Sequence, residues 1–215
     1  MKNHSSHSKM QTALDYHATF PVMEHFYTIQ GEGRNTGCAA YFIRLGGCDV
    51  GCVWCDVKES WHAAKHQLLS INEIVKNVVA SGTKNVVITG GEPMMYDLKE
   101  LTAALKNEGL NLWLETSGAY LLSGEWDWIC VSPKKFKPPL QEVLTKADEL
   151  KVIVYNKSDF EWAVINKSKT NSKCIGYLQP EYSKRTEMLP LIIDYVKKHP
   201  EWRISLQTHK VIDVP

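Results

Sequence analysis

Short apolar runs alternate with amphipathic segments along this chain from residue 24 to its end. Runs such as residues 85–89 and 151–155 are apolar through their centres, which is typical of strands that are buried on both faces of a sheet. The pattern predicts strands at residues 24–29, 40–45, 85–89, 111–115, 128–132, 151–155, 175–179 and 203–206.

Amphipathic helices are predicted between these strands, and some have recognisable ends. Ser70 and Ser158 are each followed at the third position by a glutamate. This arrangement predicts capping boxes, in which the hydroxyl and the carboxylate satisfy free N–H groups of the first turn. Residues 98–107 and 189–198 carry apolar residues at helical spacing, and the second segment stops before Pro200.

The alternation of strands and helices predicts an α/β fold with a mostly parallel sheet and right-handed crossovers. The length favours an incomplete barrel of the (β/α)6 type, with about six strands, over a complete eight-stranded barrel of about 250 residues. No repeat or linker divides the chain, so a single domain is expected over residues 22–215. Residues 1–21 are polar and lack the apolar core of a signal peptide, so a flexible tail is expected there.

The composition excludes several classes of protein. The chain has 215 residues and a formal net charge of +1, so no polyanionic partner such as a nucleic acid is implied. No apolar run approaches the length of a membrane-spanning helix. Three of the six cysteines are clustered rather than spread out as a disulfide framework. This favours a reducing compartment, and a cytoplasmic location is expected.

The three clustered cysteines, Cys48, Cys52 and Cys55, have a C-x3-C-x2-C spacing. Three thiolates this close together can bind three irons of a cubane cluster, because cysteine sulfur is the usual protein ligand of iron–sulfur centres. No fourth cysteine follows nearby, so one metal position would stay open to a ligand, as in catalytic zinc sites. From the residues alone, this is a site for a soft metal with an open position.

A structural zinc site made by the three cysteines and His62 is an alternative, although zinc ligands usually come as two separated C-x2-C pairs. In that case the protein would be a zinc-stabilised, non-catalytic binding module. The remaining cysteines are isolated. Cys130 and Cys174 lie in apolar runs and are expected to be buried as small hydrophobic side chains.

Polar residues follow almost every predicted strand. In parallel α/β folds the active site lies at the carboxyl ends of the strands, so these residues are expected to share one rim. The segments in question are the cysteine loop and the residues around Gly90, Ser117, Ser132, Gln179 and His209.

The cysteine spacing resembles that of the radical S-adenosylmethionine (SAM) enzymes, in which SAM chelates the open iron. Residues 90–93 resemble the GGEP motif of these enzymes. This implies that the glycine backbone contacts the methionine part of SAM and that Glu92 accepts hydrogen bonds from its ammonium. The resemblance also places Trp54 and Asp56, which flank Cys55, against the adenine and the cluster, and packing in the core is the other interpretation of Trp54.

Further motifs narrow the resemblance to the 7-carboxy-7-deazaguanine synthase family of queuosine and deazapurine biosynthesis. They are QGEG at residues 30–33, RLGGC at 44–48, SPK at 132–134 and QTHK at 207–210, and the resemblance covers residues 22–215. It implies a lyase in which a reduced [4Fe-4S] cluster splits SAM to a 5′-deoxyadenosyl radical. That radical abstracts hydrogen from C6 of 6-carboxy-5,6,7,8-tetrahydropterin, the ring contracts, ammonia leaves, and SAM is regenerated.

Transferred position by position, the resemblance implies two groups of contacts. The pterin is expected to contact Ile29, Gln30, Gly31, Glu32, Arg44, Thr89, His209 and Pro215, with Glu32, Arg44, Thr89 and His209 as the catalytic candidates and the terminal carboxylate of Pro215 closing the pocket. SAM is expected to contact Trp54, Cys55, Asp56, Gly90, Gly91, Glu92, Ser117, Ser132, Pro133, Lys134, Gln179, Pro180 and Glu181. Arg44 can bind a carboxylate bidentately, and a structural ion pair is its other interpretation.

One position departs from the family pattern. The family has Thr or Ser where this chain has Val57, and that hydroxyl ligates a magnesium ion that bridges to the substrate. Magnesium prefers oxygen ligands, so the ion is either held by substrate and water alone or absent. Lys58 or Glu59 is a candidate for a replacement charge or ligand.

The resemblance implies an electron donor such as flavodoxin or ferredoxin, and a homodimer. Within the superfamily, the rival is an activase that installs a glycyl radical on a partner protein, but it would need a large open face. The sequence does not determine the donor, the oligomeric state, or whether the product serves tRNA queuosine or another deazapurine pathway.

Overall fold

The structure is a computed structural model, and it describes residues 18–215. These residues form one sheet of nine strands in the order β3-β1-β2-β4-β5-β6-β7-β8-β9. The strands are β1 (Thr19–Ile29), β2 (Ala39–Leu45), β3 (Gln67–Ser70), β4 (Asn85–Gly90), β5 (Asn111–Thr116), β6 (Trp128–Val131), β7 (Glu149–Val154), β8 (Ile175–Pro180) and β9 (Trp202–Ile204). All eight predicted strands are present, with shifted ends, and β3 is an addition.

The sheet is parallel from β2 through β9, which confirms the predicted α/β class. Its first strands differ from the simple alternation. Only a short 3-10 helix, Gly33–Asn35, separates β1 from β2, and β1 pairs in antiparallel fashion with both β2 and β3. The edge strands β3 and β9 are not paired with each other, so the sheet is an open, incomplete barrel with seven parallel strands instead of about six.

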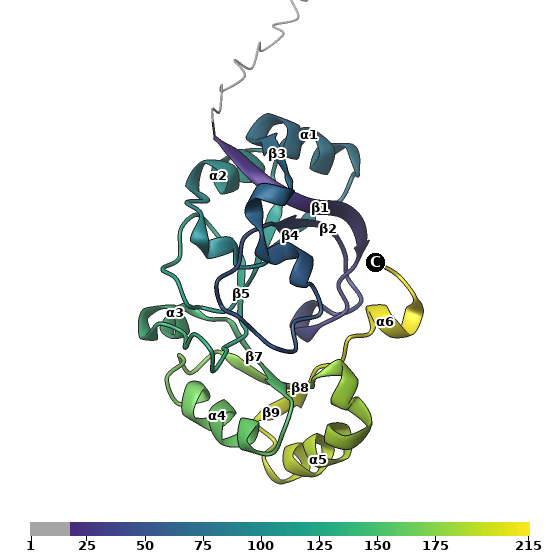
Figure 1. Ribbon diagram of the computed structural model, residues 1–215, viewed down its shortest axis with the longest axis vertical. Coiled ribbons are helices and arrows are strands. Elements are labelled where there is room, and N and C mark those ends of the chain that lie inside the picture. Colours follow the sequence, from purple (N-terminus) through teal and green to yellow (C-terminus); the bar gives the residue numbers. More distant parts are fainter. Residues whose placement is uncertain (1–17) are drawn as a thin grey trace, which may run out of the picture.

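The helices are α1 (Ile71–Ala80), α2 (Lys99–Asn107), α3 (Gln141–Lys146), α4 (Ser158–Lys167), α5 (Arg185–Lys198) and α6 (His209–Ile212). Figure 1 shows α1 to α5 around the periphery, with the loop after β2 crossing the middle of the view. Helices α1 to α5 pack on two apolar clusters of the sheet, one around Leu101 and Ile88 and one around Leu150 and Ile192. The loops at the strand ends are therefore free to build a site.

The two predicted helix caps have different outcomes. At α1, Ser70 and Glu73 form the predicted capping box. At α4 the prediction is wrong, because the N-cap is Lys157 and the hydroxyl of Ser158 donates to Asn156 Oδ1, 2.8 Å away. The Asn156 amide oxygen competes for this hydroxyl, as Asx turns do.

The predicted boundary of the N-terminal tail is also corrected. Residues Thr19, Phe20 and Pro21 belong to β1 and pair with β3, and Phe20 is buried in the core. The remainder of the predicted tail, residues 1–17, lies outside the described residues. Over residues 18–215, the helices lack the combined length and hydrophobicity that a membrane span requires.

Candidate active site

A cavity of about 290 Å³ opens at the carboxyl ends of the parallel strands, as predicted. Loops after β1, β2, β4, β5, β6 and β8 and the C-terminal segment all contribute to its wall. It is lined by most of the residues that the sequence singles out, namely Ile29, Gln30, Gly31, Glu32, Arg44, Cys48, Cys52, Trp54, Cys55, Asp56, Val57, Thr89, Gly90, Gly91, Ser117, Ser132, Lys134, Gln179, Pro180, Glu181, His209 and Pro215. Glu92 and Pro133 are not part of its lining.

The cysteine loop is fixed to the sheet by backbone hydrogen bonds. Gly47 donates its N–H to the Ser60 carbonyl at 2.6 Å, and Glu92 donates its N–H to the Gly47 carbonyl at 2.9 Å. Gly47 has φ +101°, a conformation that favours glycine. The loop therefore leaves β2 in a turn that directs Cys48 toward the cavity.

All three clustered cysteines line the cavity, where Cys52 is buried and Cys48 and Cys55 are half-buried. Burial raises the pKa of Cys52 to about 11, so a metal must displace the thiol proton when it binds. Within residues 18–215, no three His, Cys, Asp or Glu side chains gather around a point where one ion would bind. A tetrahedral zinc site requires such a gathering, whereas a cubane gives each cysteine its own iron. Three cysteine thiols on the wall of one cavity are a donor set that an iron–sulfur cluster uses.

Side-chain contacts hold the cysteine loop from both sides. On one side, Lys137 contacts Asp49 at 2.7 Å, and Tyr120 donates its hydroxyl to the same carboxylate. On the other side, Asp56 pairs with Lys210 of the C-terminal segment at 3.2 Å. Asp56 is therefore positioned by the C-terminal segment while it lines the cavity.

Glu92 has a different place from the one expected. The residue is 1% exposed, and Oε1 accepts from the Thr116 hydroxyl at 2.6 Å and from the Met94 N–H at 3.0 Å. Its Oε2 accepts from both the N–H and the hydroxyl of Ser117. Because both oxygens are engaged by the protein, Glu92 joins the GGEP turn to the end of β5 rather than facing a ligand.

The glycines of the same turn are explained by close packing inside the protein. A Cβ on Gly91 would lie 2.3 Å from the Gly47 carbonyl oxygen and 2.7 Å from Cβ of Cys48. Gly90 has φ +150°, and a Cβ there would lie 2.2 Å from the Leu45 carbonyl oxygen. These glycines therefore let the GGEP turn pack directly on the cysteine loop.

At the far end of the cavity, the QGEG segment packs against the C-terminal segment. The Gly31 carbonyl accepts from the N–H of Thr208 at 3.0 Å and from its hydroxyl at 2.9 Å. Thr28 donates its hydroxyl to the backbone oxygen of Pro215 at 3.2 Å. Residues 28–32 and 207–215 thus form one wall, although they lie at opposite ends of the described chain.

Arg44 forms the structural ion pair that was its other interpretation. Its Nε lies 2.6 Å from Glu24 Oε1 on the neighbouring strand, so the guanidinium is held by an ion pair. The side chain also lines the cavity. Phe26 and Phe42, on the same two strands, stack with ring centroids 5.6 Å apart and line the cavity as well. This aromatic wall was not predicted from the sequence.

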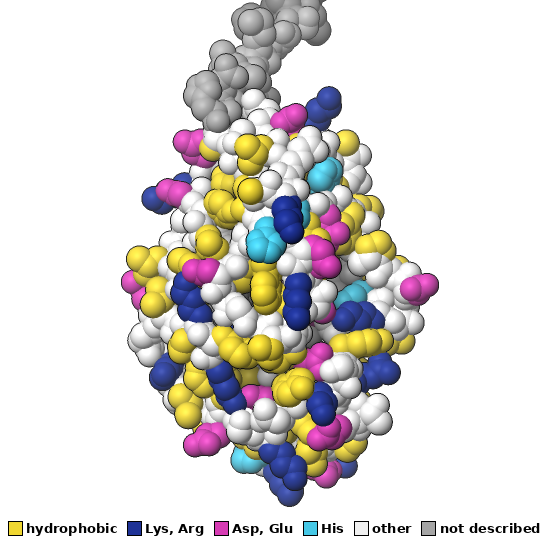
Figure 2. All heavy atoms as spheres, viewed as in Figure 1, with side chains coloured by type: hydrophobic (Ala, Val, Ile, Leu, Met, Phe, Trp, Pro, Cys, Tyr) yellow, Lys and Arg dark blue, Asp and Glu magenta, His cyan; other side chains and the backbone are white. Residues whose placement is uncertain are grey.

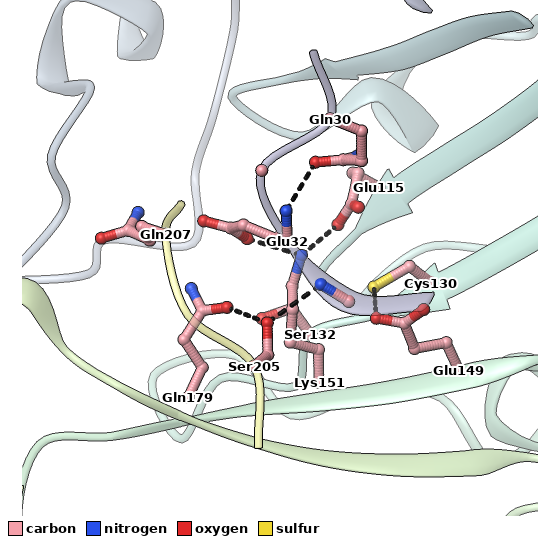
Figure 3. A network of polar contacts seen from close by, with 12 residues as sticks. Gln30, Glu32, Glu115, Cys130, Ser132, Glu149, Lys151, Gln179, Ser205 and Gln207 are labelled. Carbon is pink, nitrogen blue, oxygen red and sulfur yellow. Dashed lines mark hydrogen bonds and ion pairs between the residues drawn. The ribbon is translucent and has the colours of Figure 1, made fainter. Parts of the chain in front are cut away.

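Glu32 is the most strongly perturbed acid in the cavity. Burial raises its pKa, but the Lys151 ammonium, 2.7 Å from Oε2, outweighs burial and lowers the pKa to about 2. Lys151 also contacts Glu115 at 2.8 Å (Figure 3). Both Lys151 and Glu115 line the cavity, and sequence analysis missed them as site residues. The available signal was a lysine inside an apolar run.

Lys134 and Trp54 lie between the cysteine loop and the end of β6. Lys134 Nζ donates to the carbonyl and the hydroxyl of Ser132 and lies 5.7 Å from the Trp54 ring centroid. Burial lowers the pKa of Lys134. The predicted replacements for the magnesium ligand, Lys58 and Glu59, are exposed and do not line the cavity. The prediction that either compensates for Val57 within the site is therefore not supported by their positions.

The surface around the cavity shows no concentration of one charge. Figure 2 shows Lys and Arg side chains scattered over this face among acidic and apolar ones.

Comparison with known proteins agrees with the geometry of the site. Residues 42–154 match the model of the radical SAM superfamily. A 7-carboxy-7-deazaguanine synthase from Flavobacterium psychrophilum is 54% identical, with 96% of this chain and 98% of that protein covered. The protein of the same name from Synechocystis is 47% identical, with coverages of 91% and 94%.

A solved structure is similar over nearly the same length. The crystal structure of QueE from Escherichia coli superposes with a TM-score of 0.81 at 33% identity and covers 90% of this chain and 96% of its own. The superfamily model matches this chain, and both relatives are similar to it over nearly their whole length. The chain therefore belongs to the 7-carboxy-7-deazaguanine synthase family of the radical SAM enzymes.

Proposed function

We propose that this protein converts 6-carboxy-5,6,7,8-tetrahydropterin to 7-carboxy-7-deazaguanine with loss of ammonia. The observation that carries the proposal is the composition of one cavity. Three thiols line one end of it, and an ionised carboxylate, a guanidinium and an imidazole line the other. The cavity therefore offers a cluster site and a site for a polar heterocyclic acid within reach of each other.

The cluster end would be held by Cys48, Cys52 and Cys55. When bound there, the cluster and SAM together supply a 5′-deoxyadenosyl radical. The chain's part is to present three sulfur ligands on a loop that is fixed by hydrogen bonds to Ser60 and Glu92. Because the loop is fixed before the cofactors bind, little reorganisation is needed on binding.

SAM would lie between the cysteine loop and the ends of β5, β6 and β8. The contacts we propose are with Trp54, Cys55, Asp56, Gly90, Gly91, Ser117, Ser132, Lys134, Gln179, Pro180 and Glu181, all of which line the cavity. Glu92 and Pro133 are left out of this set because they do not line it. Glu92 would support the SAM site through Ser117 instead.

The pterin would bind at the end formed by Ile29, Gln30, Gly31, Glu32, Arg44, Thr89, His209 and Pro215. Glu32 stays ionised at neutral pH because of Lys151, so it can accept two N–H bonds from the aminopyrimidinone ring. Arg44, oriented by Glu24, can donate to the substrate carboxylate. The stacked Phe26 and Phe42 exclude water beside the ring.

The residues around Val57 do not fit a magnesium site held by the protein. The Val57 side chain has no oxygen, and its carbonyl accepts the Ser60 hydroxyl at 2.7 Å. Magnesium requires oxygen ligands in octahedral geometry. We therefore derive no step of the reaction through a magnesium ion.

Three finer assignments rest on the family alone. They are an electron donor such as flavodoxin or ferredoxin, a homodimer, and a product that serves tRNA queuosine. A cytoplasmic location rests on the clustered cysteines, which favour a reducing compartment. We propose no direct contact with nucleic acid, since the charge of the chain is balanced.

Anaerobic turnover with the carboxytetrahydropterin tests the proposal. The reconstituted protein should be brown and should form 7-carboxy-7-deazaguanine over many turnovers. SAM should not be consumed in proportion to product. A colourless protein that retains zinc, or a loaded enzyme that leaves the pterin unchanged, would contradict the proposal.

A further inference from the structure

Lys151 is a buried cation at the centre of the cavity wall. It lies within β7, is 3% exposed, and reaches carboxylates from two other elements. Its Nζ lies 2.7 Å from Oε2 of Glu32 and 2.8 Å from Oε2 of Glu115. Figure 3 shows the ammonium between the two carboxylates, which approach it from the loop after β1 and from β5. All three side chains line the cavity.

Other titratable groups face this trio from the surrounding elements. Glu149 lies nearby on β7, but its carboxylate accepts from the Arg34 N–H and from Trp128 Nε1 instead of pairing with Lys151. Burial raises the pKa of Glu149. Lys151 interacts through charge with Cys130 on β6, with Glu149 and with Lys134 after β6. Glu32 interacts in the same way with His209 on α6.

The physical need for the lysine follows from the two acids. Two carboxylates that share a site repel each other, and one of them takes up a proton at a raised pKa. A cation that contacts both removes this repulsion. In return, the carboxylates offset the cost of burying the ammonium, which would be large without partners.

We propose that Lys151 is a positioning residue that keeps Glu32 and Glu115 ionised side by side, as a double acceptor for the N–H groups of the aminopyrimidinone ring. Lys151 acts through the two carboxylates. The proposal rests on the proposed function, because the pterin supplies the N–H donors. It adds Glu115 to the residues that recognise the substrate.

The first experiment measures binding of 6-carboxypterin, an unreactive probe, to the cluster-loaded enzyme with SAM between about pH 5.5 and 8.5. For K151M, affinity relative to wild type should fall by about tenfold or more at low pH, the size expected for losing a charged hydrogen bond. The ratio should recover as pH rises, because the shared proton leaves the acid pair. Titration of the probe cancels in the ratio.

Two further variants separate positioning from a structural role. In K151M/E115Q the repulsion is gone, so Glu32 is ionised again, and affinity should rise several-fold above K151M with the pH dependence lost. K146M removes the exposed Lys146, which pairs with Glu142 at 2.8 Å, and should bind the probe as the wild type does. A structural role predicts no rescue, since the double variant loses a further buried contact.

A measurement without substrate tests the role of Lys151 even if the proposed function is wrong. Carboxyl ¹³C NMR of the wild type should show Glu32 ionised well below pH 4.5, the ordinary value for glutamate. In K151M one carboxyl should titrate above 4.5. If these shifts occur but the wild type binds no probe, the proposed function fails and the ion-pair role stands. Absence of the shifts, or equal losses of cluster and SAM binding in K151M, would overturn the inference.

Discussion

The backbone of Gly31 lies directly against the imidazole of His209. A Cβ at residue 31 would lie 2.2 Å from Nδ1 and 2.7 Å from the backbone nitrogen of His209. Residues from the two ends of the described chain thus meet in the wall of the cavity with no room for a methyl group. This contact makes the substrate end of the site depend on the C-terminal segment.

Gly31→Ala should therefore displace the C-terminal segment. The expected result is a loss of 6-carboxypterin binding of about tenfold or more, the scale for losing one or more well-placed contacts. Iron content should be unchanged, because the backbone hydrogen bonds of Gly47 with Ser60 and Glu92 still hold the cysteine loop when the contact of Asp56 with Lys210 is lost. Isothermal titration of the loaded enzyme checks the outcome.

Gly82→Ala is the matched control. Gly82 has φ +73° and open space around it, so the substitution strains the backbone by about 1 kcal/mol without a clash. It should lower stability and leave probe binding intact. Equal losses of binding in both variants would mean that general destabilisation, and not the contact with His209, explains the effect.

His209 should be neutral at pH 7. Burial lowers its pKa below the ordinary 6.5, even though Glu32 acts in the opposite direction. The unfolded chain takes up this proton as the pH falls through 6.5, whereas the folded chain does so only at lower pH. Folding stability should therefore be undiminished above pH 6.5 and decrease as the pH falls below it.

Two measurements test the state of His209. The ¹H–¹⁵N spectrum of its imidazole should titrate with a midpoint below 6.5. Unfolding by urea at about pH 7.5 and 5.5 should show a larger loss of stability for the wild type than for His209→Gln. A midpoint above 6.5 would show that Glu32 outweighs burial.

The cysteines should divide into two groups. Cys48→Ala, Cys52→Ala and Cys55→Ala should each abolish cluster binding, because three ligands leave no redundancy. Cys130→Ala and Cys174→Ala, at buried positions outside the cavity lining, should keep the cluster at a packing cost of about 1–2 kcal/mol. The two groups of variants are compared by their iron content and by their absorption at about 400 nm, which is typical of iron–sulfur clusters. Normal iron in any variant of the first group would refute the ligand assignment.

The rim of the site could be predicted from the sequence because strand ends are marked by polar residues after apolar runs. The layout rule for parallel sheets then places them together without any knowledge of their contacts. Prediction was weaker where a side chain's role depends on its neighbours. Glu92 was expected to face SAM, but Thr116 and Ser117, from a separate strand end, occupy its oxygens.

Lys151 illustrates the same limit. Its strand was predicted to begin at this residue, where a lysine would be expected to reach solvent, but β7 begins at Glu149 and the lysine is interior. The cost of burying its ammonium is offset by the carboxylates of Glu32 and Glu115, which come from the loop after β1 and from β5. The short strand β3 was missed because its four residues, with two exposed, show no strand pattern.

Val57 provides the last prediction. Its side chain lines the cavity without offering a ligand, so turnover of the wild type should persist after chelation of magnesium. Val57→Thr introduces a hydroxyl at this position and should make turnover respond to added magnesium. It should also bind magnesium more tightly than the wild type does in the presence of 6-carboxypterin, which calorimetry can measure without turnover. Val57→Ala, which removes bulk without adding oxygen, should behave as the wild type does toward the ion. If the wild type instead requires magnesium strongly and Val57→Thr does not change this, the ion is held by other oxygens and the valine has no effect on metal use.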